Sequence, residues 1–102
     1  MIYVKIHDTP QGEMVAMCDS ELLGKAYSEA NAEIDLRKYS DFYKGELVEE
    51  KAAEPVAEKK DFYTANIVGE RSVGLFIKSG VASKSDVKKV SGIPYLHIYR
   101  AV

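Results

Sequence analysis

Three residues of this chain, Cys18, His7 and His97, could together support nucleophilic chemistry, with the thiol attacking and an imidazole removing its proton. Cys18 ends the apolar run of residues 14–18, where a cysteine usually serves as a small buried hydrophobic side chain. A thiol buried among apolar groups is unreactive. Neither histidine shares a metal-ligand spacing with Cys18, so the three make a poor zinc set. We therefore predict no catalytic residue, no metal site and no cofactor.

A second candidate is the segment 66–71, Asn-Ile-Val-Gly-Glu-Arg, which we interpret as a turn leading into a helix. The first turn of a helix has free N–H groups that can hold an anion, and Arg71 could add a positive charge. Asn66, Gly69 and Arg71 therefore form a candidate anion-binding turn. Glu70 would repel the anion and the segment lacks a Gly-rich phosphate loop, so turn geometry is the favoured explanation of Asn66 and Gly69.

Basic residues of the C-terminal half form a third candidate, as contacts to RNA or to another partner. They are Arg71, Lys84, Lys88, Lys89 and Arg100. Tyr95 and Tyr99 lie among them in the sequence, and rings that stack on bases beside lysines that meet phosphates suit RNA. The pI of about 5.7 argues against this interpretation, because nucleic-acid-binding domains are typically basic.

Strands and helices must position these residues. Alternating or apolar runs predict strands at residues 2–6, 13–18, 32–36, 46–48, 87–90 and 95–99. Residues 19–25 predict a short capped helix, residues 27–31 a loop, and residues 37–44 an irregular segment held by aromatic rings. Residues 49–60 predict a helix, in which Pro55 is tolerable only in the first turn. The spacing of Val73, Phe76 and Ile77 predicts another helix over residues 70–79 that docks on a sheet.

The predicted fold class is α+β, in one small domain spanning residues 1–102. We expect a mixed, mostly antiparallel sheet built from the 2–6/13–18 hairpin, 32–36 and the C-terminal strands, with two or three helices packed on one face. A chain of 102 residues is the length of one domain. Its 46% apolar and 29% charged residues are typical of a globular protein.

Composition also limits the cellular setting. No apolar run approaches the roughly 18 residues that a membrane span needs, and the first residues lack the features of a signal peptide. One cysteine excludes an internal disulfide, which fits a reducing compartment. We expect a cytoplasmic protein without membrane association. Residues 1–50 carry a net charge of −6 and residues 51–102 a net charge of +4, and we expect the two halves to interleave and largely cancel.

Four segments of the chain, taken in order, resemble the DUF424 family of uncharacterised archaeal proteins. They are residues 18–25 (CDSELLGK), 42–48 (FYKGELV), 65–71 (ANIVGER) and 92–94 (GIP). Members of this family continue past the Ile-Pro with His-Ala-Gln, where this chain has Tyr-Leu-His at residues 95–97. The family has no assigned activity, but its association with archaeal translation genes implies a connection with translation.

Three classes of function remain open. The leading one is a small cytosolic accessory or binding protein, associated with RNA or with the translation apparatus. The second is a protein–protein interaction module without nucleic acid, in which the charge asymmetry drives partner docking or the formation of an oligomer. The third, a small enzyme, has least support, because no acid–base pair, metal set or phosphate loop occurs at a usable spacing.

Overall fold

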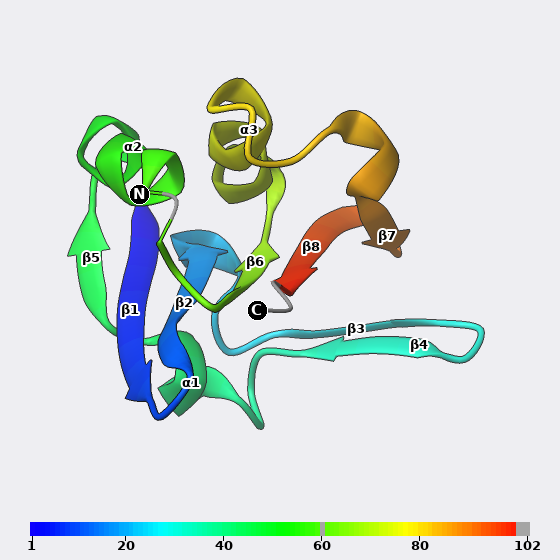
Figure 1. Ribbon diagram of the computed structural model, residues 1–102. Coiled ribbons are helices and arrows are strands. Elements are labelled where there is room, and N and C mark those ends of the chain that lie inside the picture. Colours follow the sequence, from blue (N-terminus) through cyan, green and yellow to red (C-terminus); the bar gives the residue numbers. More distant parts are fainter. Residues whose placement is uncertain (60, 100–102) are drawn as a thin grey trace.

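A six-stranded sheet organises the computed structural model, which describes residues 1–59 and 61–99 (Figure 1). Its strand order is β5-β1-β2-β6-β8-β7. The strands are β1 (Ile2–Thr9), β2 (Gly12–Asp19), β5 (Glu46–Val48), β6 (Thr64–Val68), β7 (Lys88–Val90) and β8 (Ile93–Tyr99). Among the described strands, β2 and β6 form the one parallel pair, and the other neighbours are antiparallel. The predicted mixed, mostly antiparallel sheet is confirmed.

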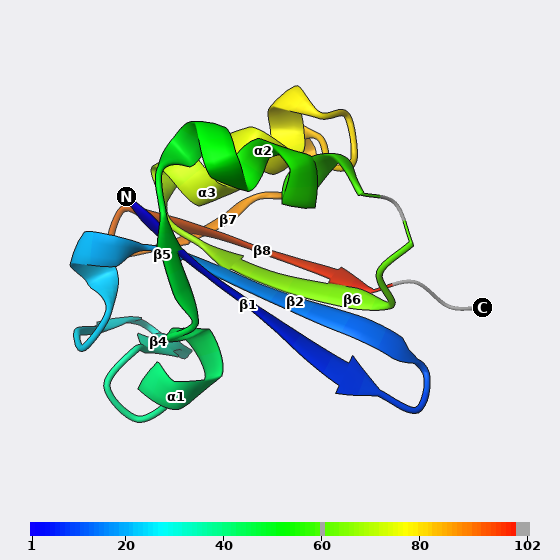
Figure 2. The same cartoon turned by 90° about the vertical axis from the view of Figure 1, so that its left-hand side faces the viewer.

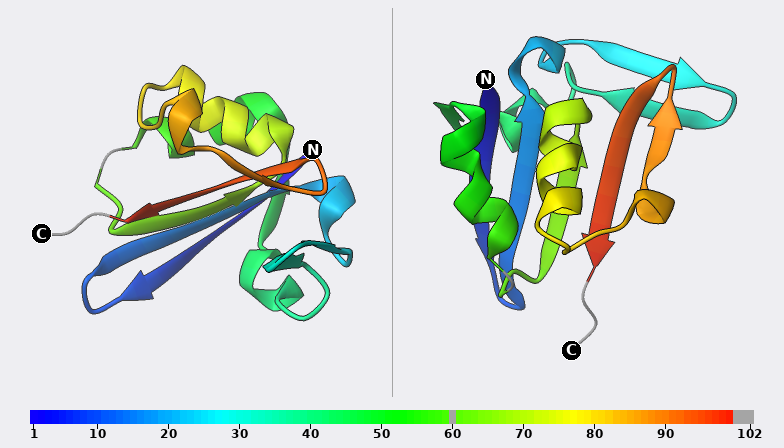
Figure 3. Two further views of the ribbon diagram at one scale, coloured as in Figure 1. Left: turned by 90° about the vertical axis from the view of Figure 1, so that its right-hand side faces the viewer. Right: turned by 90° about the horizontal axis from the view of Figure 1, so that it is seen from above.

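Helices and a hairpin cover opposite faces of this sheet (Figure 2). The helices α2 (Glu50–Glu58) and α3 (Glu70–Lys78) lie on one face. The short helix α1 (Ser40–Tyr43) and the separate hairpin of β3 (Ala26–Glu29) and β4 (Ala32–Asp35) lie on the other (Figure 3). The α+β class is confirmed, although α1 is not on the face that α2 and α3 share. None of the described helices is long and apolar enough to cross a membrane.

The main core lies between the sheet and the two longer helices. Phe76 of α3 is fully buried, and its ring packs edge-on against Phe62 with 6.2 Å between centroids. Ala53 and Ala57 form the buried side of α2, where their small side chains allow close approach to the sheet. The predicted docking face of α3 is therefore confirmed. The prediction for Pro55 is wrong, because α2 runs from Glu50 to Glu58 and places this proline in its second turn.

Three segments differ from the predicted strands and loops. Residues 64–68 form β6, a strand between β2 and β8 in the sheet, rather than the turn that we expected before α3. Residues 32–35 pair with residues 26–29 in the separate hairpin and do not enter the main sheet. Residues 26–29 are a strand rather than a loop, but three of the four are exposed, so they carry no alternation of buried side chains.

A second, smaller core lies under the hairpin. Cys18 and Val68 of the sheet pack there against Leu36, which directly follows β4. The turn between β7 and β8 anchors the hairpin, because Ser91 N donates to a carboxylate oxygen of Glu29 at 3.0 Å. The hydroxyl of Ser91 donates to the carbonyl oxygen of Ser28 at 2.8 Å. This anchoring holds the hairpin against one end of the sheet. The hairpin does not cover His97, which lies further along β8 and is exposed.

Candidate functional site

Cys18 is a structural residue in this fold. Its side chain is fully buried, and its thiol donates to the Asp19 carbonyl oxygen at 3.1 Å. Burial raises the pKa of Cys18 to about 12, so the thiol is protonated at neutral pH. His7 lies four residues along β1 from Tyr3, which faces Cys18, and four residues of strand span about 13 Å. The predicted burial of Cys18 is confirmed, and His7 is too far away to activate it.

His97 does not activate a hydroxyl nucleophile either. Its Nε2 atom lies 3.1 Å from Thr64 Oγ1, and the same hydroxyl donates to the Ile98 carbonyl oxygen at 2.7 Å. Because the threonine has one hydroxyl proton, His97 must be the donor to Thr64. The proton that a base would have to remove is therefore already bonded to a carbonyl. Within residues 1–59 and 61–99, no group of three His, Cys, Asp or Glu side chains could hold a metal ion.

The candidate anion-binding residues do not converge on one site. Asp19, the last residue of β2, lies beside the first turn of α3. Its carboxylate accepts hydrogen bonds from Arg71 N at 3.1 Å and from Ser72 N at 2.8 Å. The N–H groups that an anion would use are thus bonded to a side chain of the protein itself. Asn66 belongs to β6 rather than to a turn, so our explanation of Asn66 by turn geometry is wrong. The side chain of Asn66 lines the pocket that is described below.

The candidate basic residues are also dispersed. Arg71 forms an ion pair with Glu21, and Lys84 lies in a short 3-10 helix before β7. Lys88 and Lys89 are neighbours in β7, and consecutive residues of a strand point to opposite faces of the sheet. The register places Lys88 opposite Tyr95, on the face of the hairpin, and places Lys89 opposite Pro94. Arg100 lies outside the described residues.

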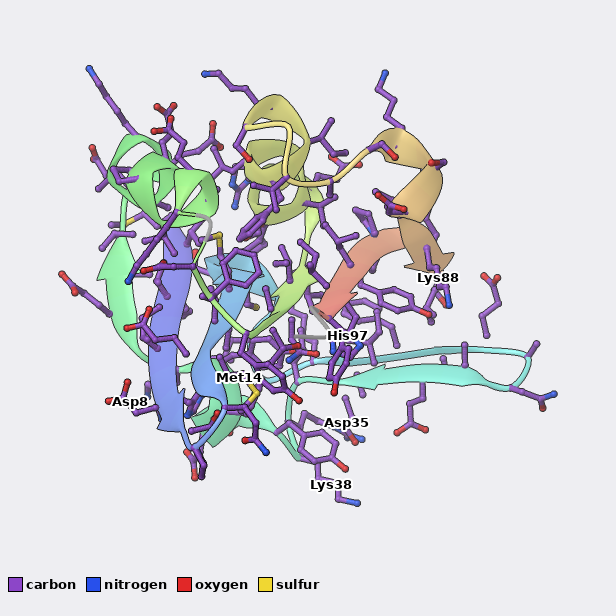
Figure 4. All side chains as sticks on the ribbon, viewed as in Figure 1. Asp8, Met14, Asp35, Lys38, Lys88 and His97 are labelled. Carbon is purple, nitrogen blue, oxygen red and sulfur yellow. The ribbon has the colours of Figure 1, made fainter. Side chains whose placement is uncertain are left out.

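A pocket opens on the sheet face opposite α2 and α3, between the sheet, β4 and the segment that contains α1. Its volume is about 390 Å³, within the range of small-molecule sites. Its aromatic residues are Tyr39, Phe42, Tyr43 and Tyr95, and its polar residues are Glu33, Asp35 and Asn66. Ile34, Leu36 and Val68 complete the lining. We call this site the aromatic pocket. Figure 4 labels Asp35, Lys38, Met14 and His97 on this side of the molecule.

Local sequence explains how these side chains reach the pocket. Asp35 ends β4, and its Oδ1 atom accepts hydrogen bonds from Arg37 N at 3.0 Å and Lys38 N at 2.9 Å. This turn redirects the chain and brings residues 39–43 beneath the sheet. Phe42 stacks on His7 with 4.7 Å between ring centroids, and it packs edge-on against Tyr43. The ring contacts fix this wall of the aromatic pocket.

The environment of the pocket shifts the pKa values of Asp35 and Tyr43. The backbone N–H of Lys38 contributes most, and that of Arg37 less, to a pKa of Asp35 below its usual range. Asp35 is therefore a carboxylate at neutral pH. Burial, with a smaller contribution from Cys18, raises the pKa of Tyr43 to about 12, so its hydroxyl stays neutral. The pocket thus combines apolar walls with an ionised carboxylate, which Arg37 Nε approaches to 3.7 Å.

The sequence contains weak signals for this pocket that we did not use. Tyr39, Phe42 and Tyr43 are three aromatic residues within five positions, and we interpreted them as anchors of an irregular segment. Asn66 is a polar residue within the short apolar run of β6, a position where a polar side chain must find a partner, solvent or a ligand. Neither signal identifies the other wall of the pocket, because the two come together only in the tertiary structure.

Comparison with known proteins supports the fold and the family. No curated protein matches the chain. A crystal structure described as that of an uncharacterized conserved protein from Methanopyrus kandleri is similar, with a TM-score of 0.79 and 22% sequence identity. The similarity covers 99% of this chain and 95% of the other, and at this identity it shows a shared fold. Residues 6–101 match the family model described as protein of unknown function DUF424, and the chain belongs to this family.

Proposed function

We propose that this domain is a small cytoplasmic RNA-binding accessory protein that takes an unpaired base of single-stranded RNA into the aromatic pocket. The observation that carries the proposal is the pocket itself, with four aromatic rings around a volume of about 390 Å³. Proteins that bind single-stranded RNA stack its bases on aromatic side chains, often on an open sheet face. The translation apparatus is one setting for such an RNA, as the family resemblance implies.

The charges near the pocket fit contact with a limited number of phosphates. Lys38 is exposed, and its Nζ atom lies 5.4 Å from the centre of the Tyr39 ring. Lys88 is exposed on β7 and faces the same side as Tyr95. The chain as a whole carries a net charge of −2, so contacts to phosphates can supply only part of the RNA affinity. Stacking of bases on the aromatic rings must supply the larger part.

The test is a fluorescence anisotropy titration with an eight-nucleotide single-stranded RNA of mixed sequence and with the same RNA in a duplex. We expect the single strand to bind more tightly, because pairing hides the bases. Tyr39 lines the pocket and is 55% exposed, so its removal should not disturb folding. Tyr39→Ala should weaken binding by about fivefold or more, since stacking contributes about 1–3 kcal/mol per base.

Tyr99→Ala is the matched control. Tyr99 is 62% exposed and does not line the aromatic pocket, so we expect this variant to bind RNA like the parent. Equal losses in Tyr39→Ala and Tyr99→Ala would contradict the pocket as the base site. If the parent binds no RNA at low salt, the RNA proposal fails.

A second candidate function is a protein–protein interaction module, and one observation favours it. The strand β5 pairs with residues 2–4 of β1, so the outer edge of residues 5–9 has no strand partner among the described residues. Ile6, with 41% exposure, lies on this open segment, and Leu47, with 45%, lies on the neighbouring edge strand β5. Open strand edges can accept a strand from another protein. Partners that survive nuclease treatment in a pulldown from native cytosol, combined with no RNA binding by the pure protein, would favour this candidate.

A further inference from the structure

The amide of Asn66 is an unused hydrogen-bonding group in the aromatic pocket. Asn66 lies between Ala65 and Ile67 in β6, both of which are buried against the helices, so its side chain points to the opposite face. The described residues provide no hydrogen-bond partner for this amide, and its polar atoms are not sealed from solvent. It can therefore offer a ligand one acceptor and two donor hydrogens.

Asp35 supplies a fixed acceptor in the same pocket. The two backbone N–H groups of residues 37 and 38 bond to Oδ1 and set the orientation of the carboxylate, and Arg37 Nε forms an ion pair with the same oxygen at 3.7 Å. Among the described residues, no hydrogen bond reaches Oδ2, and the side chain is 14% exposed. Glu33 adds a second, exposed carboxylate to the pocket lining. The pocket therefore presents acceptors from two carboxylates, with donors from the Asn66 amide and from tyrosine hydroxyls.

The four RNA bases differ in how their edges meet such a set. Guanine carries two adjacent donors, N1–H and the N2 amino group, which can both be directed at a carboxylate oxygen, and it carries the acceptor O6 beside them. Adenine and cytosine place a ring-nitrogen acceptor next to their amino group, and uracil places a carbonyl oxygen on each side of its N–H. A carboxylate would face one of these lone pairs in all three, and an unmatched polar edge in a confined site is costly.

We infer that the base which the aromatic pocket selects is guanine, with Oδ2 of Asp35 accepting from N1–H and the N2 amino group and Asn66 donating to O6. This inference rests on the proposed function, because it names the base that the proposed pocket would hold. Recognition of one base edge through a pair of hydrogen bonds is worth about 1–3 kcal/mol of discrimination, which corresponds to about fivefold or more in affinity.

The experiment uses the full chain and eight-nucleotide RNAs that contain uridine at every position except one. The central base is guanosine, inosine, adenosine, cytidine or uridine. We expect the guanosine RNA to bind about tenfold more tightly than the adenosine, cytidine and uridine RNAs. Inosine lacks the N2 amino group, so it should lie between guanosine and the others. A preference for another base, or no preference among RNAs that all bind, would overturn the inference and leave the proposed function standing.

Asp35→Asn and Asp41→Asn form a matched pair of variants. Asp35→Asn keeps an oxygen for the N–H groups of residues 37 and 38 but replaces one acceptor of the carboxylate with a donor. We expect it to reduce the preference for guanosine to about twofold. Asp41 lies on α1, is exposed and does not line the pocket, so Asp41→Asn should keep the full preference. A full preference in Asp35→Asn would overturn the inference.

Asn66→Ala provides a second test if Asp35→Asn proves unstable. The amide makes no hydrogen bond to the described residues, so the variant should fold, and it should lose about fivefold of the preference for guanosine over adenosine. Equal preference in Asn66→Ala and the parent would contradict the role given to this amide.

A guanine base can come from RNA or from a free nucleotide, so the last arm titrates guanosine 5′-monophosphate. Binding of the mononucleotide as tightly as the guanosine RNA would keep the inference and contradict RNA as the ligand. No binding of any RNA or of the mononucleotide would overturn both.

Discussion

The Asp19 carboxylate occupies the space that a side chain on residue 69 would need. A Cβ atom at Gly69 would lie 2.3 Å from Asp19 Cγ, and the φ angle there is +110°, where L side chains are strained. The carboxylate accepts hydrogen bonds from Arg71 N, from Ser72 N and from the Ser72 hydroxyl, the last at 2.7 Å. The end of β2 is thereby joined to the start of α3, where a negative charge also suits the helix dipole.

Gly69→Ala should destabilise the protein strongly. The added methyl group must displace the buried Asp19 carboxylate or shift the backbone, so we expect a loss of about 2–4 kcal/mol in the free energy of unfolding. Gly74→Ala is the control, because Gly74 is an exposed position of α3 with no neighbouring atom within 4 Å. It should stabilise the helix by about 0.5–1 kcal/mol. Urea unfolding of the two variants tests this expectation. Similar unfolding midpoints in Gly69→Ala and Gly74→Ala would contradict it.

Alkaline pH should destabilise the fold through Cys18 and Tyr43. Both folded-state pKa values are raised to about 12, above ordinary values of about 8.5 and 10. Between the unfolded-state and folded-state pKa values, the unfolded chain has lost the protons that the folded chain keeps. The contribution of the two groups to the free energy of unfolding is therefore fully present below about pH 8.5 and is lost as the pH rises toward 12. The melting temperature should therefore decrease over this window.

Tyr43→Phe should make that decrease shallower, because it removes one of the two groups. The same burial predicts that Cys18 in the native protein reacts slowly with a thiol reagent and rapidly after denaturation. An unchanged pH profile in Tyr43→Phe, or rapid labelling of native Cys18, would show that these groups are accessible.

Phe76→Ala should remove a large part of the main core. Phe76 is fully buried between α3 and the sheet, and truncation of such a side chain costs about 3–5 kcal/mol. A small domain has about 5–15 kcal/mol in total, so the melting temperature should fall sharply. Leu47→Ala, at a position that is 45% exposed, should have a much smaller effect. Similar melting of Phe76→Ala and the parent would mean that α3 does not contribute to the core.

Local patterns were sufficient to predict the first hairpin and α3. Both rest on the spacing of neighbouring apolar residues, and in α3 this spacing places Val73 and Phe76 on one buried side. The strand β6 escaped prediction because we interpreted Asn66 and Gly69 as turn residues, although Thr64 and Asn66 alternate with Ala65 and Ile67 as in a strand. Its assignment depends on pairing with β2 and β8, each of which lies at least 25 residues away in the sequence.

The site was less predictable than the fold for the same reason. Residue types alone suggested an anion site at the start of α3, but Asp19, 52 residues before Arg71, already bonds its N–H group. The aromatic residues 39–43 were visible in the sequence, whereas their position opposite Asn66 depends on the hairpin and on the turn after Asp35. Chemistry that depends on distant partners cannot be inferred from spacing along the chain.

The alternation of β7 provides a test of how charge contributes to RNA binding. Lys88 faces the side of Tyr95 and the aromatic pocket, and Lys89 faces the opposite side, opposite Pro94 in the register. Both side chains are exposed, so reversing either charge should barely change stability. If RNA lies across the pocket face, its phosphates can reach Lys88 but not Lys89.

Lys88→Glu should therefore weaken the binding of single-stranded RNA, whatever its sequence, and lower the salt dependence of affinity. Loss of one phosphate contact reduces the slope of log affinity against log salt by about 0.7 for a single strand. Lys89→Glu should keep the slope of the parent, although the same charge has been reversed one residue away. The measurement is RNA titration of the parent and both variants at two or more salt concentrations. Equal changes in the two variants would mean that charge acts through the whole protein, and a loss confined to Lys89→Glu would place the RNA on the other face of the sheet.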